Sequence, residues 1–430
     1  MILFVNKSKI QGSVEIPGSK SHTIRALFIA SLAEGISEIK DPLSSDDADS
    51  AIRTCTSFGA QIHQSDELVK VRGFGGNPGI PVDIVDVGNS GTTLRFAVSL
   101  AGLCCKDSGW TVLTGDSQIR KRPLAPLLEA VNDLGAEAFS TRTGGMAPVV
   151  VKGRMTGGYT SLDAVTSQFL SSLLICAPML ERDTRIEITR LNEVPYAEMT
   201  LWWLDRQKIT YINEDFKSIE IKGGQIYRPF SIAIPGDFSS ATFFAVLAAI
   251  SGGTIELKNL DMSDPQGDKA VFAYLSAMGA VIEHNGRTGS ITVRGGNSLH
   301  GIEIDMNATP DALPAMAVAA CFAEGRTKLV NVPQARLKET DRINVMRIEL
   351  EKMGAKIKEL PDGLEIEQSL LKPSALSGHG DHRIVMALAT AGLCLDGETS
   401  IDTAEAMNVT FPQFAELAAS CGGRLQMVKQ

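Results

Sequence analysis

The sequence lacks the features that mark secreted, membrane-spanning or disulfide-rich proteins. Its seven cysteines are an odd number and include no C-x-x-C pair, which favours reduced, mostly structural thiols in a cytosol-like compartment. Its longest apolar stretches, such as residues 243–250, fall well short of the ~20 residues that span a bilayer. The short apolar run at the N-terminus follows no cationic region and does not resemble a signal peptide. We therefore expect a cytoplasmic protein without a membrane span.

Positive charge is also scarce. The chain has 41 lysines and arginines against 50 aspartates and glutamates, so its net charge is −9. A molecule of this charge does not attract nucleic acid as a whole, and any anion site must be a local cluster. The 430 residues are enough for two or three domains.

Several catalytic signatures are missing as well. The chain contains neither a Walker loop nor a Gly-x-Ser-x-Gly elbow. His379 and His382 are three residues apart, but Arg383 is a poor neighbour for a divalent cation and no Glu or Cys lies at ligand spacing. The pattern thus favours an Asp-His-Arg helix cap over a metal site, and we expect no metal.

What the sequence does contain is an internal repeat. Residues 16–35 and 234–253 both begin with Ile-Pro-Gly, continue through a polar turn, and end in an apolar helical stretch that reaches Gly. The same plan recurs at residues 87–102, 162–178, 305–325 and 378–397. In most repeats a second predicted helix ends in a similar tag, found at residues 57–62, 133–138, 277–282, 352–357 and 420–425, whereas the third repeat has DRQKIT (205–210) instead.

Six repeats in 430 residues have a spacing of roughly 70, longer than the 20–50 residues of solenoids and propellers. That spacing favours βαβ-type subdomains. Because the second Ile-Pro-Gly falls near the middle of the chain, the pattern predicts two domains of three repeats. One would span residues 19–235, and the other would combine residues 1–18 with 236–430.

Each repeat opens its first helix with Ser, Thr, Asp or Asn. These are ordinary helix caps whatever the function, but helix N-termini also attract anions. Charged residues cluster at or near these starts, in segments 19–25, 88–95, 115–123, 335–343 and 380–383. Taken alone, a Lys-Glu-x-Asp-Arg run is more typical of a solvated helix face. However, charged residues recur at or near equivalent places in the repeats, and this recurrence indicates an anion site instead.

The ordered motifs resemble a known family. PGSKSHTIR, GNSGTTLR, GD-x(4)-KRP, TSQF, IPGD-x-SSA, PDA, LKETDR, DHR and TFP occur in that order. They are similar to 3-phosphoshikimate 1-carboxyvinyltransferases, also called 5-enolpyruvylshikimate-3-phosphate synthases. The resemblance implies an α/β fold of two domains, each with three βαβαββ units, forming an inside-out barrel with helices inside and sheets outside. It also implies transfer of the enolpyruvyl group of phosphoenolpyruvate to the 5-hydroxyl of shikimate 3-phosphate, without metal or organic cofactor.

The same resemblance assigns site residues. Those matched to shikimate 3-phosphate binding are Lys20, Ser21, Arg25, Thr166, Ser167, Gln168, Asp311, Gln334 and Lys338, with Tyr196 nearby. Those matched to phosphoenolpyruvate binding are Lys20, Gly91, Arg122, Gln168, Arg342 and Arg383. Both ligands are polyanions, which cations and amide donors bind through charge-assisted hydrogen bonds.

The resemblance further assigns the catalytic groups Asp311, Glu339, Lys20 and Lys338. Asp311 matches the base that takes the hydroxyl proton. Glu339 matches the group that protonates the methylene carbon and later removes a proton from the methyl, and Lys338 can hold charge near the hydroxyl.

The chain departs from the family pattern at a few positions. Gln334 stands where some relatives have Asn, and Phe96 where some have Pro. Val409 stands where some relatives carry a Lys that reaches phosphoenolpyruvate, and Glu193 replaces a Ser that some use for the substrate phosphate. We carry neither of these last two contacts over.

Two other hypotheses remain at this point. A sister enzyme transfers enolpyruvate to UDP-N-acetylglucosamine, but its catalytic loop carries a Cys that GDSQIRKRP (115–123) lacks. A non-catalytic anion-binding repeat protein would have no need for the paired groups Asp311 and Glu339. We expect an enzyme of small-molecule substrates that acts as a monomer and binds neither nucleic acid nor membrane.

Overall fold

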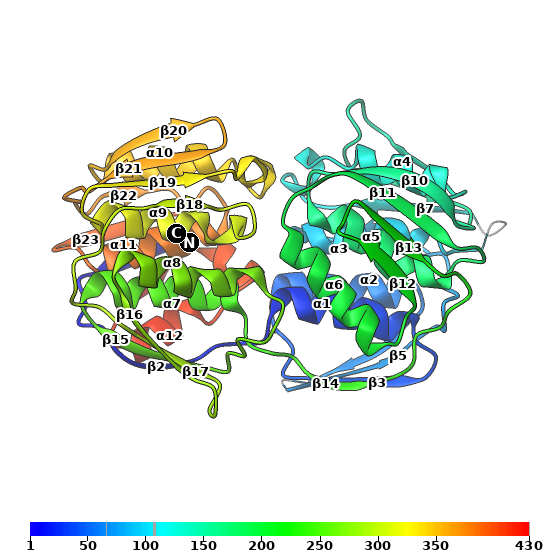
Figure 1. The fold of residues 1–430 in the computed structure, drawn as a ribbon, viewed down its shortest axis with the longest axis horizontal. Helices are drawn as coiled ribbons and strands as arrows, with labels where there is room; N and C mark the ends of the chain where they lie inside the picture. Colours follow the sequence, from blue (N-terminus) through cyan, green and yellow to red (C-terminus); the bar gives the residue numbers. More distant parts are fainter. Residues whose placement is uncertain (66, 106–108, 430) are drawn as a thin grey trace. The chain divides into compact units, whose positions relative to one another are not determined.

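The chain forms two compact units, each containing three repeats. In the computed structural model, which describes residues 1–65, 67–105 and 109–429, unit 1 comprises Met1–Ser19 and Pro235–Gln430, and unit 2 comprises Lys20–Ile234. The chain passes between the units at the two Ile-Pro-Gly segments. Over the described residues the strands form six four-stranded sheets, three in each unit (Figure 1).

Unit 2 repeats one plan of strand, helix, strand, helix and hairpin. Its helices are α1 (Lys20–Leu32), α2 (Asp46–Ser57), α3 (Gly91–Ala101), α4 (Ala125–Asp133), α5 (Ser167–Cys176) and α6 (Val194–Arg206). Its strands are β3 (Ile36–Lys40), β4 (Gln61–Gln64), β5 (Leu68–Arg72), β6 (Val85–Asp86), β7 (Trp110–Thr114), β8 (Glu137–Ser140), β9 (Val149–Lys152), β10 (Gly158–Ala164), β11 (Thr184–Leu191), β12 (Tyr211–Glu214), β13 (Ser218–Ile221) and β14 (Ser231–Ala233).

Unit 1 follows the same plan. Its helices are α7 (Phe238–Ser251), α8 (Ala270–Met278), α9 (Leu313–Phe322), α10 (Arg342–Lys352), α11 (His382–Gly392) and α12 (Phe414–Ser420). Its strands are β1 (Ile2–Asn6), β2 (Gln11–Glu15), β15 (Thr254–Lys258), β16 (Val281–Asn285), β17 (Ser290–Arg294), β18 (Glu303–Asp305), β19 (Arg326–Val330), β20 (Lys356–Leu360), β21 (Gly363–Glu367), β22 (Ala375–Leu376), β23 (Glu398–Ile401) and β24 (Arg424–Val428).

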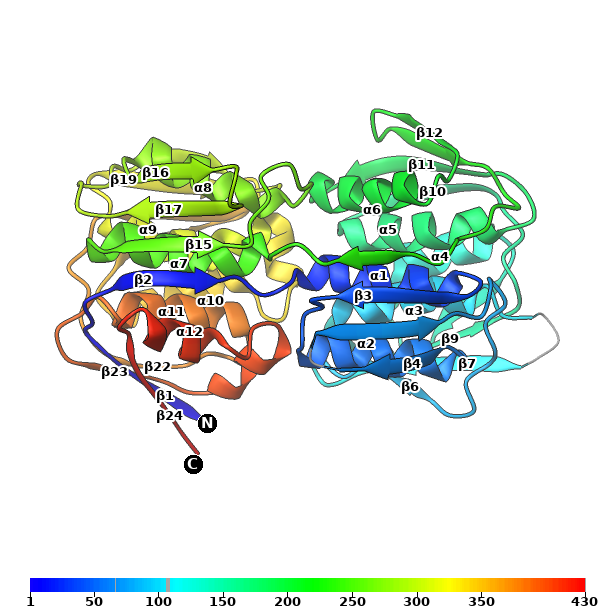
Figure 2. The ribbon, with the colours of Figure 1, turned by 90° about the horizontal axis from the view of Figure 1, so that it is seen from below.

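Each sheet combines one parallel pair with two antiparallel pairs. In the sheet β6-β7-β9-β8, β6 pairs parallel to β7, and β9 pairs antiparallel to both β7 and β8. A parallel pair needs a long crossover, which α3 supplies here. Each Ile-Pro-Gly segment separates a strand from the helix that follows it in the chain. Strand β2 precedes α1 of unit 2 but pairs with β15 in unit 1, and β14 precedes α7 of unit 1 but pairs with β3 in unit 2 (Figure 2).

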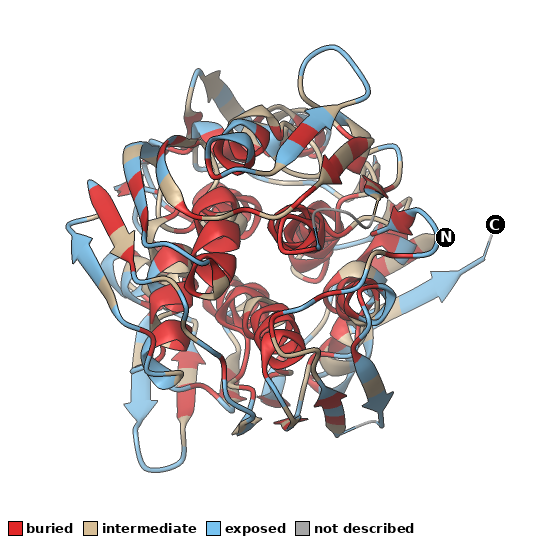
Figure 3. Ribbon diagram, turned by 90° about the vertical axis from the view of Figure 1, so that its right-hand side faces the viewer, coloured by how far each residue is buried: buried red, intermediate tan, exposed pale blue. Residues whose placement is uncertain are grey.

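The core of each unit is built from the first helix of every repeat. In α7 every residue from Phe238 to Ala249 is buried, and α1, α3, α5, α9 and α11 are buried on nearly all faces too. A helix that is apolar all round belongs in the interior. Many strands alternate buried residues with less buried ones, as in β7, and the strands lie outside these helices (Figure 3). Within the described ranges, no helix has both the length and the apolar character needed to cross a membrane.

The prediction that every first helix starts with a side-chain cap is only partly correct. Thr166, Asp237 and Asp381 accept the amide hydrogen two residues ahead at the starts of α5, α7 and α11. Ser90 makes no such bond before α3, because its hydroxyl lies 2.8 Å from the Thr93 hydroxyl. Thr309 precedes a 3₁₀ turn, Pro310–Ala312, so α9 begins without it. The caps are thus a common feature of the repeats but not a uniform one.

Candidate active site

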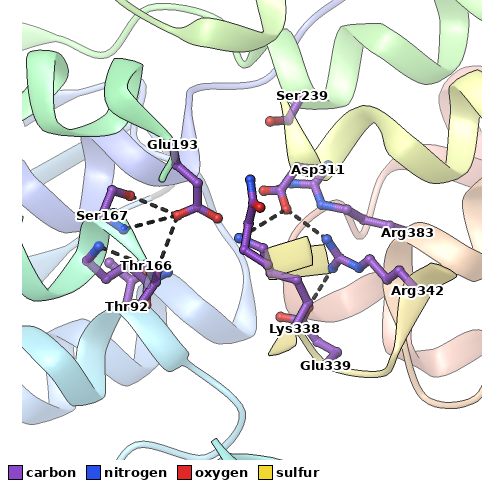
Figure 4. A network of polar contacts seen from close by, with 12 residues as sticks. Thr92, Thr166, Ser167, Glu193, Ser239, Asp311, Lys338, Glu339, Arg342 and Arg383 are labelled. Atoms are coloured by element: carbon purple, nitrogen blue, oxygen red, sulfur yellow. Dashed lines mark hydrogen bonds and ion pairs between the residues drawn. The ribbon is translucent and has the colours of Figure 1, made fainter. Parts of the chain in front are cut away.

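In unit 1, the predicted catalytic residues meet around one buried guanidinium. Arg342, the first residue of α10, is 1% exposed. Its Nη1 lies 2.7 Å from Asp311 Oδ1 and its Nη2 lies 2.5 Å from Glu339 Oε2 (Figure 4). Its Nε lies 2.8 Å from Asp381 Oδ2. These carboxylates come from the turn before α9, the loop before α10 and the cap of α11. Residues at the starts of three helices therefore hold the Arg342 guanidinium in place.

The charges of this cluster offset one another. Burial acts to lower the pKa of Arg342, but Asp381, Glu339 and Asp311 outweigh it and raise that pKa well above its ordinary value. The guanidinium is therefore permanently charged.

Three cations approach the Asp311 carboxylate. Besides Arg342, Arg383 Nη2 lies 2.9 Å from Asp311 Oδ2, and Lys338 Nζ lies 3.9 Å from Oδ1. Gln334 lies in the 3₁₀ segment Pro333–Leu337 and donates from Nε2 to the Asn307 carbonyl at 3.0 Å. Five residues predicted for catalysis or phosphoenolpyruvate binding in this half thus share one network, and Gln334 lies on a neighbouring turn.

A buried aspartate adds to this network. Asp268 is 2% exposed and accepts a hydrogen bond from the Ser239 hydroxyl at the start of α7. Burial is the main cause that raises the Asp268 pKa to about 6, the negative charge of Asp311 adds to the effect, and Arg383 opposes it. The sequence prediction did not include this residue.

In unit 2, the start of α1 carries two of the predicted cations. Lys20 Nζ lies 3.2 Å from Asp47 Oδ2 on α2. Arg25, one turn later, donates to the Thr200 hydroxyl at 2.9 Å, the Ser171 hydroxyl at 3.2 Å and the Tyr196 carbonyl at 2.9 Å. Its Nη1 also donates to the Ser21 carbonyl at 3.0 Å. Burial lowers the pKa of Arg25 to about 10, which still leaves it charged at neutral pH.

A second group in unit 2 surrounds the start of α3. Gly91 opens this helix, and a Cβ at this position would collide with the guanidinium groups of Arg122 and Arg95. Arg122 follows the 3₁₀ turn Ile119–Lys121 and is 6% exposed. Gln168 on α5 donates to the Thr92 hydroxyl at 3.2 Å, which joins the starts of α3 and α5. Glycine is therefore required here for the close approach of two arginines.

The start of α5 holds a carboxylate. Glu193 Oε2 accepts hydrogen bonds from the Ser167 hydroxyl at 2.9 Å, the Thr166 hydroxyl at 3.1 Å and the Ser167 amide at 3.3 Å (Figure 4). Glu193 is 1% exposed and is the residue before α6. The predicted substrate-binding residues Thr166 and Ser167 thus contact an anion that belongs to the protein.

The predicted site residues therefore form separate groups within the two units. The sequence prediction missed their carboxylate partners Asp47, Asp268, Asp381 and Glu193. Asp381 lies in the quoted DHR motif, and Glu193 was noticed only as a departure from the family pattern, so both had a signal. The LKETDR run is not a solvated helix face, because Glu339 is about 10% exposed at its side chain and Arg342 only 1%.

The fold is shared with enolpyruvyl transferases of known structure. An EPSP synthase from Acinetobacter baumannii matches with a TM-score of 0.82 and 27% identity, covering 99% of this chain and 100% of that chain. The enolpyruvyl transferase NikO from Streptomyces tendae matches with a TM-score of 0.79 and 15% identity, covering 99% of this chain and 98% of that chain. These likenesses confirm the predicted two-domain α/β fold and define the protein as one of the enolpyruvyl transferase class.

The sequence comparisons identify the family within that class. The family model of EPSP synthase (3-phosphoshikimate 1-carboxyvinyltransferase) matches residues 5–417. A 3-phosphoshikimate 1-carboxyvinyltransferase of Acetivibrio thermocellus is 62% identical over 98% of both chains, and one of Ruminiclostridium cellulolyticum is 60% identical over 100% of both. The chain belongs to the EPSP synthase (3-phosphoshikimate 1-carboxyvinyltransferase) family. The predicted family and enzyme class are therefore confirmed, and transfer to UDP-N-acetylglucosamine is not favoured.

Proposed function

We propose that the chain performs the reaction of its family with the acid-base groups of unit 1 and the acceptor-binding groups of unit 2. The enzyme is an enolpyruvyl transferase of the shikimate pathway: it joins the enolpyruvyl group of phosphoenolpyruvate to the 5-hydroxyl of shikimate 3-phosphate and releases phosphate. The observation that carries the division of roles is the cluster in which Asp311 and Glu339 share Arg342.

In this proposal Asp311 takes the hydroxyl proton. Arg342, Arg383 and Lys338 surround its carboxylate, and cations favour the ionised form that can accept a proton. Lys338 also stabilises the oxygen as its proton leaves. Lys20 assists from unit 2 by holding negative charge of both substrates.

Glu339 has the opposite requirement, because it must carry a proton in order to deliver it to carbon. Its 2.5 Å contact with Arg342 favours the charged carboxylate. Phosphoenolpyruvate is matched to Arg342 and Arg383, and its phosphate and carboxylate compete with Glu339 for the same guanidinium. Binding of this substrate therefore weakens the Glu339–Arg342 pair and lets Glu339 act as the acid.

Unit 2 binds the acceptor. Arg25, Ser21, Thr166, Ser167 and Gln168 supply cationic, hydroxyl and amide donors for shikimate 3-phosphate, and Gln334 of unit 1 adds a further contact. Ser167 is also the first residue of α5, and a helix N-terminus favours anions. Gly91 and Arg122 bind phosphoenolpyruvate beside Gln168.

The test of the reaction is phosphate release from phosphoenolpyruvate with each of two acceptors. We expect release with shikimate 3-phosphate and none with UDP-N-acetylglucosamine. Release that depends on UDP-N-acetylglucosamine would overturn the proposal.

The test of the acid is Glu339→Gln, which keeps the shape of the side chain but cannot deliver a proton. We expect turnover to fall by ~10²–10⁴ with both substrates still bound. Glu351→Gln is the matched control, since Glu351 lies on the exposed side of α10 and pairs only with Arg347 among the contacts described. Turnover of Glu339→Gln within a few-fold of the parent would contradict the role of Glu339.

We further propose that the enzyme is cytoplasmic, monomeric and not a nucleic-acid-binding protein. The net charge of −9 supports the last point. Light scattering at micromolar concentration tests the monomer, for which we expect a mass near the 46.0 kDa of one chain.

A further inference from the structure

In the proposed function, donors of Thr166 and Ser167 bind the substrate phosphate. In the structure, the carboxylate of Glu193 is hydrogen-bonded to these same donors. Its Oε2 accepts from the Ser167 hydroxyl, the Thr166 hydroxyl and the Ser167 amide at 2.9–3.3 Å. We call these three donors, the Thr166 hydroxyl, the Ser167 hydroxyl and the Ser167 amide, the phosphate cradle. In Figure 4 the Glu193 side chain points directly at this cradle.

The position of Glu193 is costly for the fold. Its backbone is left-handed, with φ of 61° and ψ of 44°, a conformation that non-glycine residues rarely adopt. Its side chain is also almost fully buried, and a buried charge is unfavourable unless it is hydrogen-bonded. The cradle and the positive end of α5 supply the compensation.

The cradle has room for one anion at a time. A substrate phosphate bound to the Ser167 amide and hydroxyl would lie within a few ångströms of Glu193 Oε2, and like charges at that distance repel strongly in a buried site. The carboxylate and the phosphate therefore compete for the same donors.

We propose that Glu193 is a specificity-determining residue that fills the phosphate cradle when shikimate 3-phosphate is absent and is displaced when it binds. The inference rests on the proposed function, which places the substrate phosphate at Ser167. A ligand that offers only a hydroxyl or a single negative charge gains little by replacing a carboxylate. A phosphate dianion with three acceptor oxygens gains more, so the enzyme selects phosphorylated acceptors and binds them less tightly than an unoccupied cradle would.

The experiment compares ligand affinities of the full-length protein by calorimetry. Glu193→Gln keeps the size of the side chain and removes its charge, whereas Glu193→Asp keeps the charge. We expect Glu193→Gln to bind shikimate 3-phosphate roughly tenfold more tightly than the parent, about 1.4 kcal/mol, and Glu193→Asp to change affinity less. Affinity for unphosphorylated shikimate should change less than twofold in both variants. The KM for shikimate 3-phosphate should fall in Glu193→Gln while the KM for phosphoenolpyruvate does not.

Glu198→Gln is the matched control, because it removes the same charge from an exposed position on α6. Equal effects of Glu198→Gln and Glu193→Gln would mean that only net charge matters and would overturn the inference. Unchanged or weaker binding of shikimate 3-phosphate by Glu193→Gln would also overturn the inference. If Glu193 only positioned Ser167, its substitution would weaken binding of this substrate. A thermal melt of each variant confirms that it is folded.

Ser167→Ala separates this inference from the proposed function. If Ser167→Ala weakens shikimate 3-phosphate binding while Glu193→Gln has no effect, the cradle is correct and the competition is wrong. If Ser167→Ala has no effect either, the substrate phosphate binds elsewhere, and the site assignment fails together with the inference.

Discussion

Gly91 is the residue whose substitution tests the phosphoenolpyruvate assignment most directly. A Cβ at this position would displace the guanidinium groups of Arg122 and Arg95. Because these are the flexible ends of long side chains, Gly91→Ala should fold normally. The shifted Arg122 should then bind phosphoenolpyruvate poorly, and we expect its KM to rise at least about tenfold, since misplacement by about 1 Å can cost as much as 10²-fold. Steady-state kinetics with each substrate varied in turn measure this.

The KM for shikimate 3-phosphate should change far less in Gly91→Ala. Gly286→Ala is a suitable control, because a Cβ there meets no atom within 4 Å. An unchanged phosphoenolpyruvate KM would place that substrate away from Gly91 and Arg122.

Asp268 makes the stability of unit 1 depend on pH. Its pKa in the fold is about 6, compared with an ordinary value of 3.8, so the folded state holds this proton more tightly than the unfolded state does. The contribution of the protonated Asp268 carboxyl to the free energy of unfolding is therefore present in full below pH ~4 and is lost as the pH rises to ~6. Asp268→Asn does not ionise, so relative to the parent it should gain up to about 3 kcal/mol between pH 4 and pH 7. Urea unfolding at both pH values tests the sign, and a difference that is the same at pH 4 and pH 7 would contradict it.

At this scale the sequence locates some residues that the structure brings together, but it does not predict all of their contacts. The motifs locate Asp311, Glu339 and Arg342, which the structure joins in one network. They do not reveal Asp47 as the partner of Lys20, because Asp47 lies on another helix in a run of acidic residues typical of any first turn. Contacts across helices depend on packing, which local sequence does not encode.

Among the elements, the start of α11 combines two functions. Asp381 accepts the Arg383 amide at 2.9 Å as the helix cap, and it also pairs with the buried Arg342 at 2.8 Å. Asp381→Ala removes both interactions and leaves a buried guanidinium short of one counter-charge. We expect a loss of about 3–5 kcal/mol in the free energy of unfolding, the range seen when one partner of a buried ion pair is removed.

Asp341→Ala is the matched control for this prediction. Asp341 caps α10 through the Asn344 amide and pairs with Arg336, but its side chain is 36% exposed. Loss of an exposed cap of this kind costs only ~1 kcal/mol. Equal destabilisation of the two variants in denaturant unfolding would show that the pair between Asp381 and Arg342 adds nothing to the cap.

The repeats explain why the elements were easier to predict than their ends. The recurring tag after the second helix marks α2, α4, α8, α10 and α12, and the apolar segments mark the six buried helices. The caps varied because the segment after Thr309 begins as a 3₁₀ turn, and because the Ser90 hydroxyl interacts with Thr93 instead of the backbone. Side chains that can bond locally in two ways make helix starts hard to predict.

For the whole molecule, the chain ends belong to the same sheet. Strand β1 pairs with both β23 and β24, and Leu3 faces Met427 across that ladder. No periodicity predicts the pairing of β1 with β24, because it joins residues more than 400 positions apart. The division into two groups of three repeats, with residues 1–18 joined to the second half, could be predicted from the two Ile-Pro-Gly segments, whereas the pairing of β2 with β15 and of β14 with β3 required the structure.

The last prediction concerns motion of the two units. Unit 2 carries Lys20, Arg25 and Arg122, and unit 1 carries Asp311 and Glu339. Neither unit alone can both neutralise the substrates and complete the acid-base pair. Shikimate 3-phosphate should therefore draw the units together, with the chain bending near Pro17–Gly18 and Pro235–Gly236, and so complete the phosphoenolpyruvate site. We expect small-angle scattering to give a smaller radius of gyration with saturating shikimate 3-phosphate than without ligand.

Unphosphorylated shikimate is the control ligand for this measurement, because it keeps its carboxylate but lacks the phosphate that the cationic groups of unit 2 are proposed to bind. It should reduce the radius less than shikimate 3-phosphate does at equal saturation. A radius that stays constant with saturating shikimate 3-phosphate would mean that the substrates reach both sets of residues without closure. The two Ile-Pro-Gly segments would then serve only to carry the chain from one unit to the other, and residues 16–25 would bind an anion without acting as a hinge.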